Sequence, residues 1–295
     1  MGRLSTLDVR RITAAPPFES EVSWDDQQVR TYHLALGAGA DPTDPAELRY
    51  TYERDLRVLP SFGVVAGGGV GFQVLEQPGV DLDLANVLHG SQEITVHRPL
   101  PPSARAVART RVPAVHDKGS AAVLQVESVL SGEDGRPLLT QRSEIFARGA
   151  GGFGGERGPA GRTTPPPGPP DLVIDLPTLP QQALLYRLCG DWNPLHADPA
   201  TARAAGYDRP VLHGLCTYGI ALKGAVDRLL DGDVHRVRGY RARFAGVFYP
   251  GETLRVELWA EGADRYALRA GAVERDNAPV LTGGHLIHFP LLEAQ

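Results

Sequence analysis

The stretch Tyr186-Arg-Leu-Cys-Gly-Asp-Trp-Asn-Pro-Leu-His196 brings a carboxylate, a carboxamide and an imidazole close together in the chain. Pro194 is unfavourable inside a helix but is well tolerated in a first helical turn, and Asn193 before it is a typical N-cap. The pattern predicts that one helix ends near Gly190 and that a short one begins at Pro194. The three polar side chains then lie at a break between helices, where they can converge.

These side chains suit proton transfer beside a carbonyl group. Asp191 can orient or deprotonate water, and His196 titrates near neutrality, so it can give or take a proton. Asn193 can donate a hydrogen bond to a carbonyl oxygen that gains negative charge. Gly214 lies just before a further helical stretch, so its backbone N–H can supply a second donor to the same oxygen. The residues are therefore candidates, Asp191 and His196 for catalysis, and Asn193 and Gly214 for substrate binding.

Two other interpretations of this segment stay open. Asp-x-Asn-Pro is also an ordinary turn and cap signature, which would serve folding alone. Asp191, His196 and Asp198 could instead bind a metal ion, although no His-x-x-x-His or Cys-x-x-Cys pattern accompanies them. A serine hydrolase is not indicated, because the chain has no Gly-x-Ser-x-Gly motif.

The composition is that of an ordinary folded protein. The 295 residues are 42% hydrophobic and 22% charged, which suits two domains or one large fused unit with a sizeable core. The net charge of −5, without a long basic run, argues against nucleic acid as a partner. The only cysteines, Cys189 and Cys216, fit a reducing compartment. Because no signal core or membrane-spanning stretch is present, we expect a cytoplasmic protein without a membrane partner.

A Gly- and Pro-rich stretch, residues 149–170, divides the chain. It has no helical or strand periodicity, and we expect an exposed linker that is flexible where Gly dominates and stiffer where Pro dominates. It separates an N-terminal domain, residues 1–148, from a C-terminal domain, residues 171–295. Three motifs recur in the same order in both domains and indicate a duplication: Val87-Leu-His-Gly90 with Val211-Leu-His-Gly214, Pro101–Val107 with Pro250–Val256, and Asp134–Thr140 with Asp276–Thr282. His89 and His213 occupy equivalent places in this repeat, which favours a structural role for both.

Each domain begins with helical segments and continues with alternating, strand-like segments, so the fold class is α+β. The periodicity predicts helices over Asp26–Leu36, Leu179–Cys189 and Cys216–Leu230. It predicts strands over Gln92–Arg98, Ala121–Leu130, Thr253–Trp259 and Arg265–Glu274. Asp-Gly and Asp-Asn pairs between such runs are typical of hairpin turns.

Longer segments around the polar set match a known family. Residues 186–196, Ala205–Gly219 and Arg243–Gly251 resemble the signature of MaoC-like type 2, (R)-specific enoyl-CoA hydratases. Segments of the N-terminal half, among them Val58–Val64 and Leu88–Ile94, resemble the two-domain members, so the resemblance covers nearly the whole chain. It implies a double hot-dog fold, with two tandem halves that each have a long helix wrapped by a curled antiparallel sheet.

The resemblance also implies a reaction, the reversible hydration of a trans-2-enoyl-CoA to an (R)-3-hydroxyacyl-CoA. Asp191 and His196 match the acid/base pair that holds the catalytic water, and Asn193 and the Gly214 N–H match the groups near the thioester carbonyl. Coenzyme A is part of the substrate, and no metal or other cofactor is expected, because the thioester already acidifies C2. Since the net charge is negative, polyanionic coenzyme A would need a local basic patch.

The N-terminal half lacks the polar set, because Gly37-Ala-Gly-Ala-Asp-Pro42 has neither the Asn nor the His. The resemblance implies that this half is non-catalytic and helps to bind the acyl chain. Between Gly37 and Val87 lie 49 residues, whereas 20 lie between Gly190 and Val211. We therefore expect an inserted segment, residues 54–80, that accommodates a bulky acyl group, and a single active site per chain.

Two other functions stay open. One is a dehydratase that acts on acyl-carrier-protein thioesters in polyketide or fatty-acid assembly. The other is a non-catalytic acyl-thioester binding protein, which would have no use for Asp191, Asn193 and His196 together. A fused pair of hot dogs already supplies the pairing that single ones obtain by dimerising, but a further homodimer is compatible with the fold.

Overall fold

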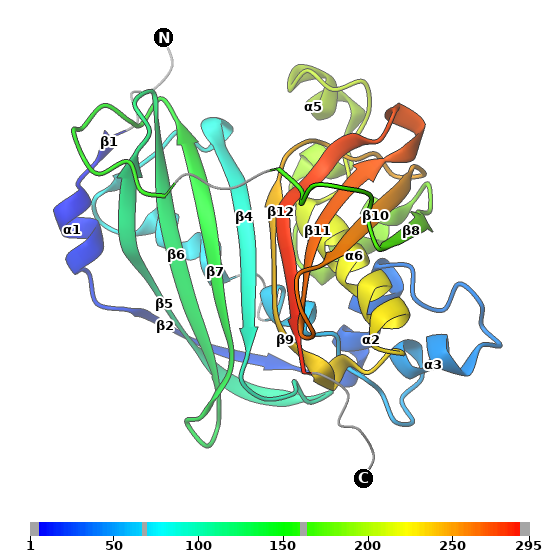
Figure 1. Cartoon of the computed structure of the whole chain (residues 1–295). Coiled ribbons are helices and arrows are strands. Elements are labelled where there is room, and N and C mark those ends of the chain that lie inside the picture. Colours follow the sequence, from blue (N-terminus) through cyan, green and yellow to red (C-terminus); the bar gives the residue numbers. More distant parts are fainter. Residues whose placement is uncertain (1–5, 67–69, 160–163, 290–295) are drawn as a thin grey trace.

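The computed structural model describes residues 6–66, 70–159 and 164–289. Its dominant feature is a ten-stranded antiparallel sheet in the order β2-β5-β6-β7-β4-β9-β12-β11-β10-β8 (Figure 1). The N-terminal half contributes β2 (Phe18–Trp24), β4 (Val87–Val96), β5 (Ala104–Asp117), β6 (Ala121–Gly132) and β7 (Pro137–Arg148). The C-terminal half contributes β8 (Leu172–Pro177), β9 (Val237–Phe244), β10 (Thr253–Ala260), β11 (Arg265–Ala272) and β12 (Ala278–His288). Within this sheet, the first strand of each half (β2 or β8) lies at an outer edge and the second (β4 or β9) lies at the centre. This shared arrangement confirms the duplication.

Short helices, with η for 3-10 helices, connect these strands. They are α1 (Val9–Ala14), α2 (Asp26–Ala35), α3 (Pro45–Thr51), η1 (Pro60–Val64), η2 (Val70–Glu76), η3 (Leu84–Asn86), α4 (Gln182–Tyr186), η4 (Arg187–Cys189), η5 (Pro194–His196), α5 (Pro199–Ala204), α6 (Gly214–Leu229), η6 (Val234–Arg236) and η7 (Val273–Arg275). A small two-stranded sheet pairs β1 (Thr6–Leu7) with β3 (Val80–Asp81). The three predicted helices are confirmed as α2, α4 with η4, and α6, and the four predicted strands coincide with β4, β6, β10 and β11. No helix in the described ranges combines the length and apolar character that crossing a membrane requires.

Helix α6 is the centre of the core. Every residue from Cys216 to Val226 is buried, and a helix that is apolar on all sides must be enclosed by other elements. Gly219 lets α2 approach closely, since a Cβ at this position would lie 2.7 Å from the Tyr32 hydroxyl. Tyr32 and Tyr186 therefore pack in one continuous core with α6 and strands of both halves. The C-terminal half is a complete hot-dog unit, joined to its N-terminal counterpart through β4 and β9 in a double hot-dog.

The expectation that each half contains a long helix was wrong for the N-terminal half. In the place that corresponds to α6, the described residues form only the short helices η1 and η2, and residues 67–69 lie outside the described ranges. Three consecutive glycines, Gly67–Gly69, disfavour a helix that continues through this segment.

The repeated Val-Leu-His-Gly motif is also not a structural repeat. Val87–Gly90 begins strand β4, whereas Val211–Gly214 leads into helix α6, so His89 and His213 are not equivalent. The true counterparts are β4 and β9, and the segments before them, residues 36–86 and 187–236, have nearly the same length. The expectation that residues 54–80 are an inserted segment is therefore wrong. Those residues take the place of α6, and Leu59 and Phe62 among them are fully enclosed in the core.

The glycine-rich part of the linker is largely exposed, as expected, but hydrogen bonds dock it on the N-terminal half. The Asp117 carboxylate accepts hydrogen bonds from the backbone N–H groups of Gly152 (2.9 Å), Gly119 (2.8 Å) and Gly154 (2.7 Å). These N–H groups hold the pKa of Asp117 below its usual range. Further along, the Trp259 indole donates to the Gly168 carbonyl (3.1 Å). Residues 160–163 lie outside the described ranges.

Candidate active site

The polar segment forms the predicted break between helices. Gly190 ends η4 with φ 108°, a left-handed conformation that favours glycine. Asn193 caps η5, because its Oδ1 accepts from the Leu195 N–H (3.0 Å). The Asp191 Oδ1 in turn accepts from the Asn193 N–H (3.1 Å). The cap leaves the Asn193 amide nitrogen as a hydrogen-bond donor and the second oxygen of Asp191 as an acceptor.

His196 is held in one tautomer by its backbone neighbour. Its Nδ1 lies 2.8 Å from the Val211 carbonyl oxygen, which can only accept, so Nδ1 carries the proton and Nε2 keeps its lone pair. Burial lowers the pKa of His196, and the Arg187 cation lowers it further, while the Val211 hydrogen bond and Asp191 oppose this change. The neutral ring, with a basic Nε2, is thereby favoured near neutral pH.

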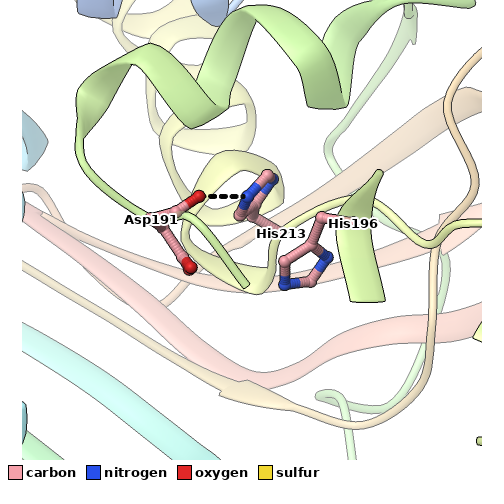
Figure 2. A group of neighbouring side chains, drawn as sticks. All are labelled: Asp191, His196 and His213. Carbon is pink, nitrogen blue, oxygen red and sulfur yellow. Dashed lines mark hydrogen bonds between the residues drawn. The ribbon is translucent and has the colours of Figure 1, made fainter. Parts of the chain in front are cut away.

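His213 belongs to the same cluster, which the sequence interpretation missed. Its ring stacks on His196 with centroids 3.8 Å apart, and its Nε2–H donates to the Asp191 main-chain carbonyl (3.3 Å), as Figure 2 shows. Burial, and then the neighbouring His196, lower the pKa of His213 to about 4, so it stays neutral. The position of His213 directly before Gly214 could have placed it in the site. The repeat instead paired it with His89 and favoured a structural role for both.

The same three side chains bear on the metal interpretation. Nitrogen and oxygen atoms of Asp191, His196 and His213 lie within 4.8 Å of one another. The two imidazole rings are stacked with their planes 30° apart, and one nitrogen of each ring faces a backbone carbonyl. Asp198, the other suggested ligand, instead caps α5 through the N–H groups of Ala200 and Thr201 (both 3.0 Å). The described residues therefore bring Asp191, His196 and His213 together, and Asp198 is not part of this cluster.

Gly214 is the first residue of α6, so its N–H has no acceptor within the helix. The residue is exposed, and the positive end of the helix dipole adds to the pull of this N–H on an anion. A Cβ at this position would lie 3.1 Å from the Phe244 ring, so only glycine leaves the approach open without moving that ring. The hydrogen bonds from His196 to Val211 and from His213 to Asp191 join the two loops that carry all four predicted residues.

A cavity of about 430 Å³ lies beside this cluster, between the two halves. Its walls come from β2, α2, η1 and η4, and it ends at Gly190, directly before Asp191. The lining residues are Trp24, Gln27, Gln28, Thr31, Phe62, Val65, Ala66, Leu188, Cys189 and Gly190. The N-terminal half thus supplies most of the walls of this cavity, and the C-terminal half closes it with the residues that directly precede Asp191 in the chain.

Arg187 lies against the turn that carries Asp191. Its Nη1 donates to the Asn193 carbonyl (3.0 Å), and its guanidinium lies over the exposed Trp192 ring (5.1 Å). Because its charge lowers the pKa of His196, Arg187→Gln should raise that pKa and move the acid limb of the kcat/KM profile to higher pH. The other groups that face His196, namely Asp191 and His213, are unchanged in this variant.

Arg187→Lys is the matched control for this prediction, since it keeps the charge and should keep the wild-type acid limb. Rates measured from pH 5 to 9 with saturating and limiting substrate separate the two variants. An acid limb that is the same in the Gln variant as in wild type would show that Arg187 does not tune His196.

Comparisons with known proteins agree with this geometry. The family model described as MFE-2 hydratase 2 N-terminal domain matches residues 22–149, and the MaoC like domain matches residues 162–279. The chain is 51% identical to the Enoyl-CoA hydratase ChsH3 of Mycobacterium tuberculosis, over 95% of this chain and 98% of that protein. It is 38% identical to the peroxisomal Enoyl-CoA hydratase 2 of Arabidopsis thaliana, over 90% of each. A solved MaoC-like dehydratase from Phytophthora capsici superposes with a TM-score of 0.86 at 27% identity, over 98% of this chain and 100% of that one.

The two matched models lie in tandem and fall on the two halves of the double hot dog, with the polar cluster in the second. The identity to full-length relatives extends through both halves rather than through the signature alone. The chain therefore belongs to the two-domain MaoC-like hydratase family, in which an MFE-2 hydratase 2 N-terminal domain precedes a MaoC like domain.

Proposed function

We propose that the protein is a hydro-lyase that catalyses the reversible hydration of trans-2-enoyl-CoA to (R)-3-hydroxyacyl-CoA. One observation supports this most strongly. The basic Nε2 of His196 and the carboxylate of Asp191 lie together beside an exposed helix N-terminus, at the end of a cavity between the two halves. Two relatives that match 95% and 90% of the chain carry the name enoyl-CoA hydratase.

In the proposed mechanism, Asp191 and His196 hold one water molecule. The water oxygen bonds to C3 while His196 Nε2 takes one of its protons, and the π electrons of the C2–C3 bond move towards the thioester carbonyl. The Gly214 N–H and the Asn193 amide stabilise the negative charge on that oxygen. The protonated His196 then gives up its proton, C2 of the enolate takes one up, and the histidine returns to its neutral form. Because the thioester acidifies C2, this proposal requires no metal or redox cofactor.

The cavity between the halves is the proposed acyl-chain site. Val65→Phe should narrow it and penalise long chains, since each buried methylene contributes ~0.8 kcal/mol, or about fourfold in kcat/KM. Turnover of crotonyl-CoA should change little, because its short chain does not extend far from the thioester. A panel of enoyl-CoAs of graded length and bulk measures the effect.

Val173→Phe is the control for this variant, because Val173 is exposed on edge strand β8 and does not line the cavity. It should leave the chain-length profile unchanged. An equal loss for crotonyl-CoA and for long enoyl-CoAs in the Val65 variant would place the acyl chain elsewhere.

Loss of enoyl absorbance, with chiral analysis of the product, tests the reaction itself. No turnover of any enoyl-CoA in the panel would leave the binding-protein alternative, and faster turnover of the matching acyl-carrier-protein thioester would identify the carrier as protein. The coenzyme A headgroup, the cytoplasmic location and a homodimer belong to the same proposal. The two free cysteines support a reducing compartment, although one relative is named peroxisomal, and cell fractionation and light scattering test location and assembly.

A further inference from the structure

The segment that connects β9 to β10, residues 245–252, belongs to the part of the sequence that resembles the family, but it contributes no side chain to the polar cluster. It ends in Glu252, whose side chain is only 6% exposed. A carboxylate this deeply enclosed is costly unless charged and polar groups satisfy it. The partners of Glu252 therefore show what the segment is built to hold.

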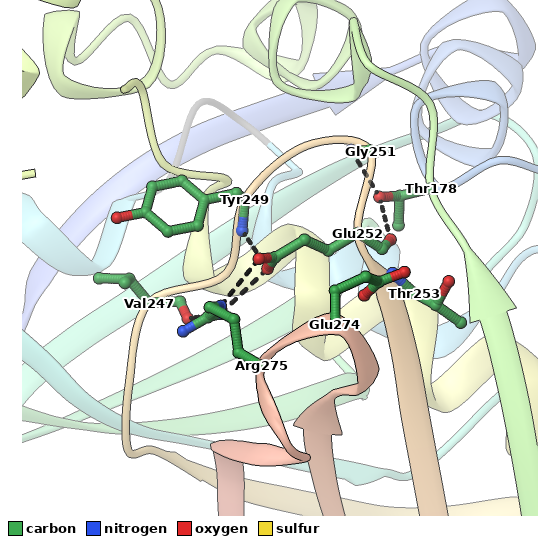
Figure 3. Close-up of polar contacts among 8 residues, drawn as sticks. All are labelled: Thr178, Val247, Tyr249, Gly251, Glu252, Thr253, Glu274 and Arg275. Atoms are coloured by element: carbon green, nitrogen blue, oxygen red, sulfur yellow. Dashed lines mark hydrogen bonds and ion pairs between the residues drawn. The ribbon is translucent and has the colours of Figure 1, made fainter. Parts of the chain in front are cut away.

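Glu252 and Arg275 fix the segment from inside, as Figure 3 shows. The Arg275 guanidinium donates to Glu252 through Nε (2.8 Å) and Nη2 (3.0 Å). The same Nη2 donates to the Val247 carbonyl (2.7 Å), and the Glu252 carboxylate accepts from the Tyr249 N–H (3.0 Å). One bidentate ion pair thus holds the segment at two backbone positions.

Thr178, just beyond strand β8, fixes the end of the segment. Its hydroxyl donates to the Glu252 carbonyl (2.7 Å) and accepts from the Gly251 N–H (3.0 Å). The hydroxyl therefore uses both its donor and its acceptor on this one turn. Thr178→Val removes both contacts and keeps the shape of the side chain, whereas Thr178→Ser keeps the hydroxyl.

The segment contacts the candidate active site directly. The carbonyl of Phe248, a residue that is 1% exposed, accepts from the Leu212 N–H (2.7 Å). Leu212 follows Val211, whose carbonyl accepts the Nδ1–H of His196. The position of the segment therefore determines where the acceptor for His196 lies.

We propose that Glu252, Arg275 and Thr178 are positioning residues that orient His196 through the backbone of residues 245–252 and the loop before α6. The proposal rests on the hydratase function, because it assigns these side chains to the action of the base. A shift of about 1 Å in a catalytic group far from the mutated residue can cost 10²-fold in rate.

Thr178→Val and Glu252→Gln should each lower kcat about 10- to 100-fold while KM changes by less than about threefold. Thr178→Ser and Arg275→Lys should recover part of the loss. Asp175→Asn is the control. Asp175 on β8 makes a bidentate ion pair with Arg255 on β10, but it is exposed and does not contact the segment. It should retain wild-type kcat. Thermal unfolding of each variant sets an assay temperature at which all are folded.

The pH profile separates orientation from general damage. The Val211 hydrogen bond raises the pKa of His196, so a displaced carbonyl should lower that pKa and move the acid limb of kcat/KM to lower pH. Asp191, Arg187 and His213, the charged or titratable groups that face His196, are unchanged in these variants. Reduced activity from partial unfolding would leave the limb in place.

The ¹⁵N NMR chemical shifts of the His196 ring in Thr178→Val test the proposal without an activity assay. Loss of the Nδ1–H···O hydrogen bond changes the chemical shifts of both ring nitrogens. Wild-type shifts and wild-type kcat in this variant would overturn the proposal even if Glu252→Gln fails to fold. A wild-type protein without hydratase activity would overturn the proposed function instead, and the NMR comparison would still decide the orientation of the ring.

Discussion

His196→Gln is expected to lower kcat for the hydration of crotonyl-CoA about 10²- to 10⁴-fold, the usual contribution of a general base. The glutamine amide lies about as far along the side chain as Nε2, whereas the wild-type ring is anchored to the Val211 carbonyl through Nδ1. The amide offers no titratable lone pair in place of Nε2. The acid limb of the pH profile should therefore disappear together with the rate.

Asp191→Asn should have an effect of similar size for a different reason. An asparagine oxygen can still accept from the Asn193 N–H and keep the turn, but the negative charge beside His196 is lost. Asp198→Asn is the matched control, since asparagine also caps helices and Asp198 only caps α5. Initial rates and thermal unfolding curves of the three variants provide the test. A catalytic variant that retains a tenth of the wild-type rate would remove that residue from the proposed mechanism.

The turn that carries Asp191 could be predicted from sequence because its determinants are local. A glycine that allows a left-handed φ, an N-cap and a proline at the first helical position all lie within five residues, 190–194. The strands of each half could also be predicted from local determinants, since period-two alternation and hairpin residues mark each strand. The hairpins before β7 and β12 therefore appeared as a repeat in both sequence and structure.

The errors concerned contacts between residues far apart in the chain. Four identical residues begin a strand at Val87 but lead into a helix that starts at Gly214, because their neighbours, and not the motif, decide the structure. The docking of the linker depends on Asp117, a residue at the end of β5 whose partners are backbone N–H groups without a sequence pattern. The stacking of His213 on His196 likewise depends on how two loops meet.

At Gly214 a local requirement, the start of helix α6, coincides with a long-range one, the approach of the Phe244 ring. Gly214→Val should lower kcat about 10²- to 10³-fold, which is the typical cost of losing one preorganised carbonyl donor. The branched side chain extends into the Phe244 ring, which already lies 3.1 Å from the Cβ position, so the start of α6 must shift and take the N–H with it. Gly214→Ala places a single methyl there and should show a smaller loss.

A second substitution distinguishes this steric cause from damage to the helix. Phe244→Leu on its own should affect kcat less than Gly214→Val does, and in combination with Gly214→Ala it should restore much of the lost rate, because it removes the ring atoms that crowd the methyl. Alanine favours helical structure by ~1 kcal/mol over glycine, so a fall in helix stability is not the expected cause of the loss. If the double variant is no more active than Gly214→Ala while all variants unfold at the wild-type temperature, crowding by Phe244 is not what displaces the donor. A wild-type rate in Gly214→Val would show that the reaction does not use this N–H.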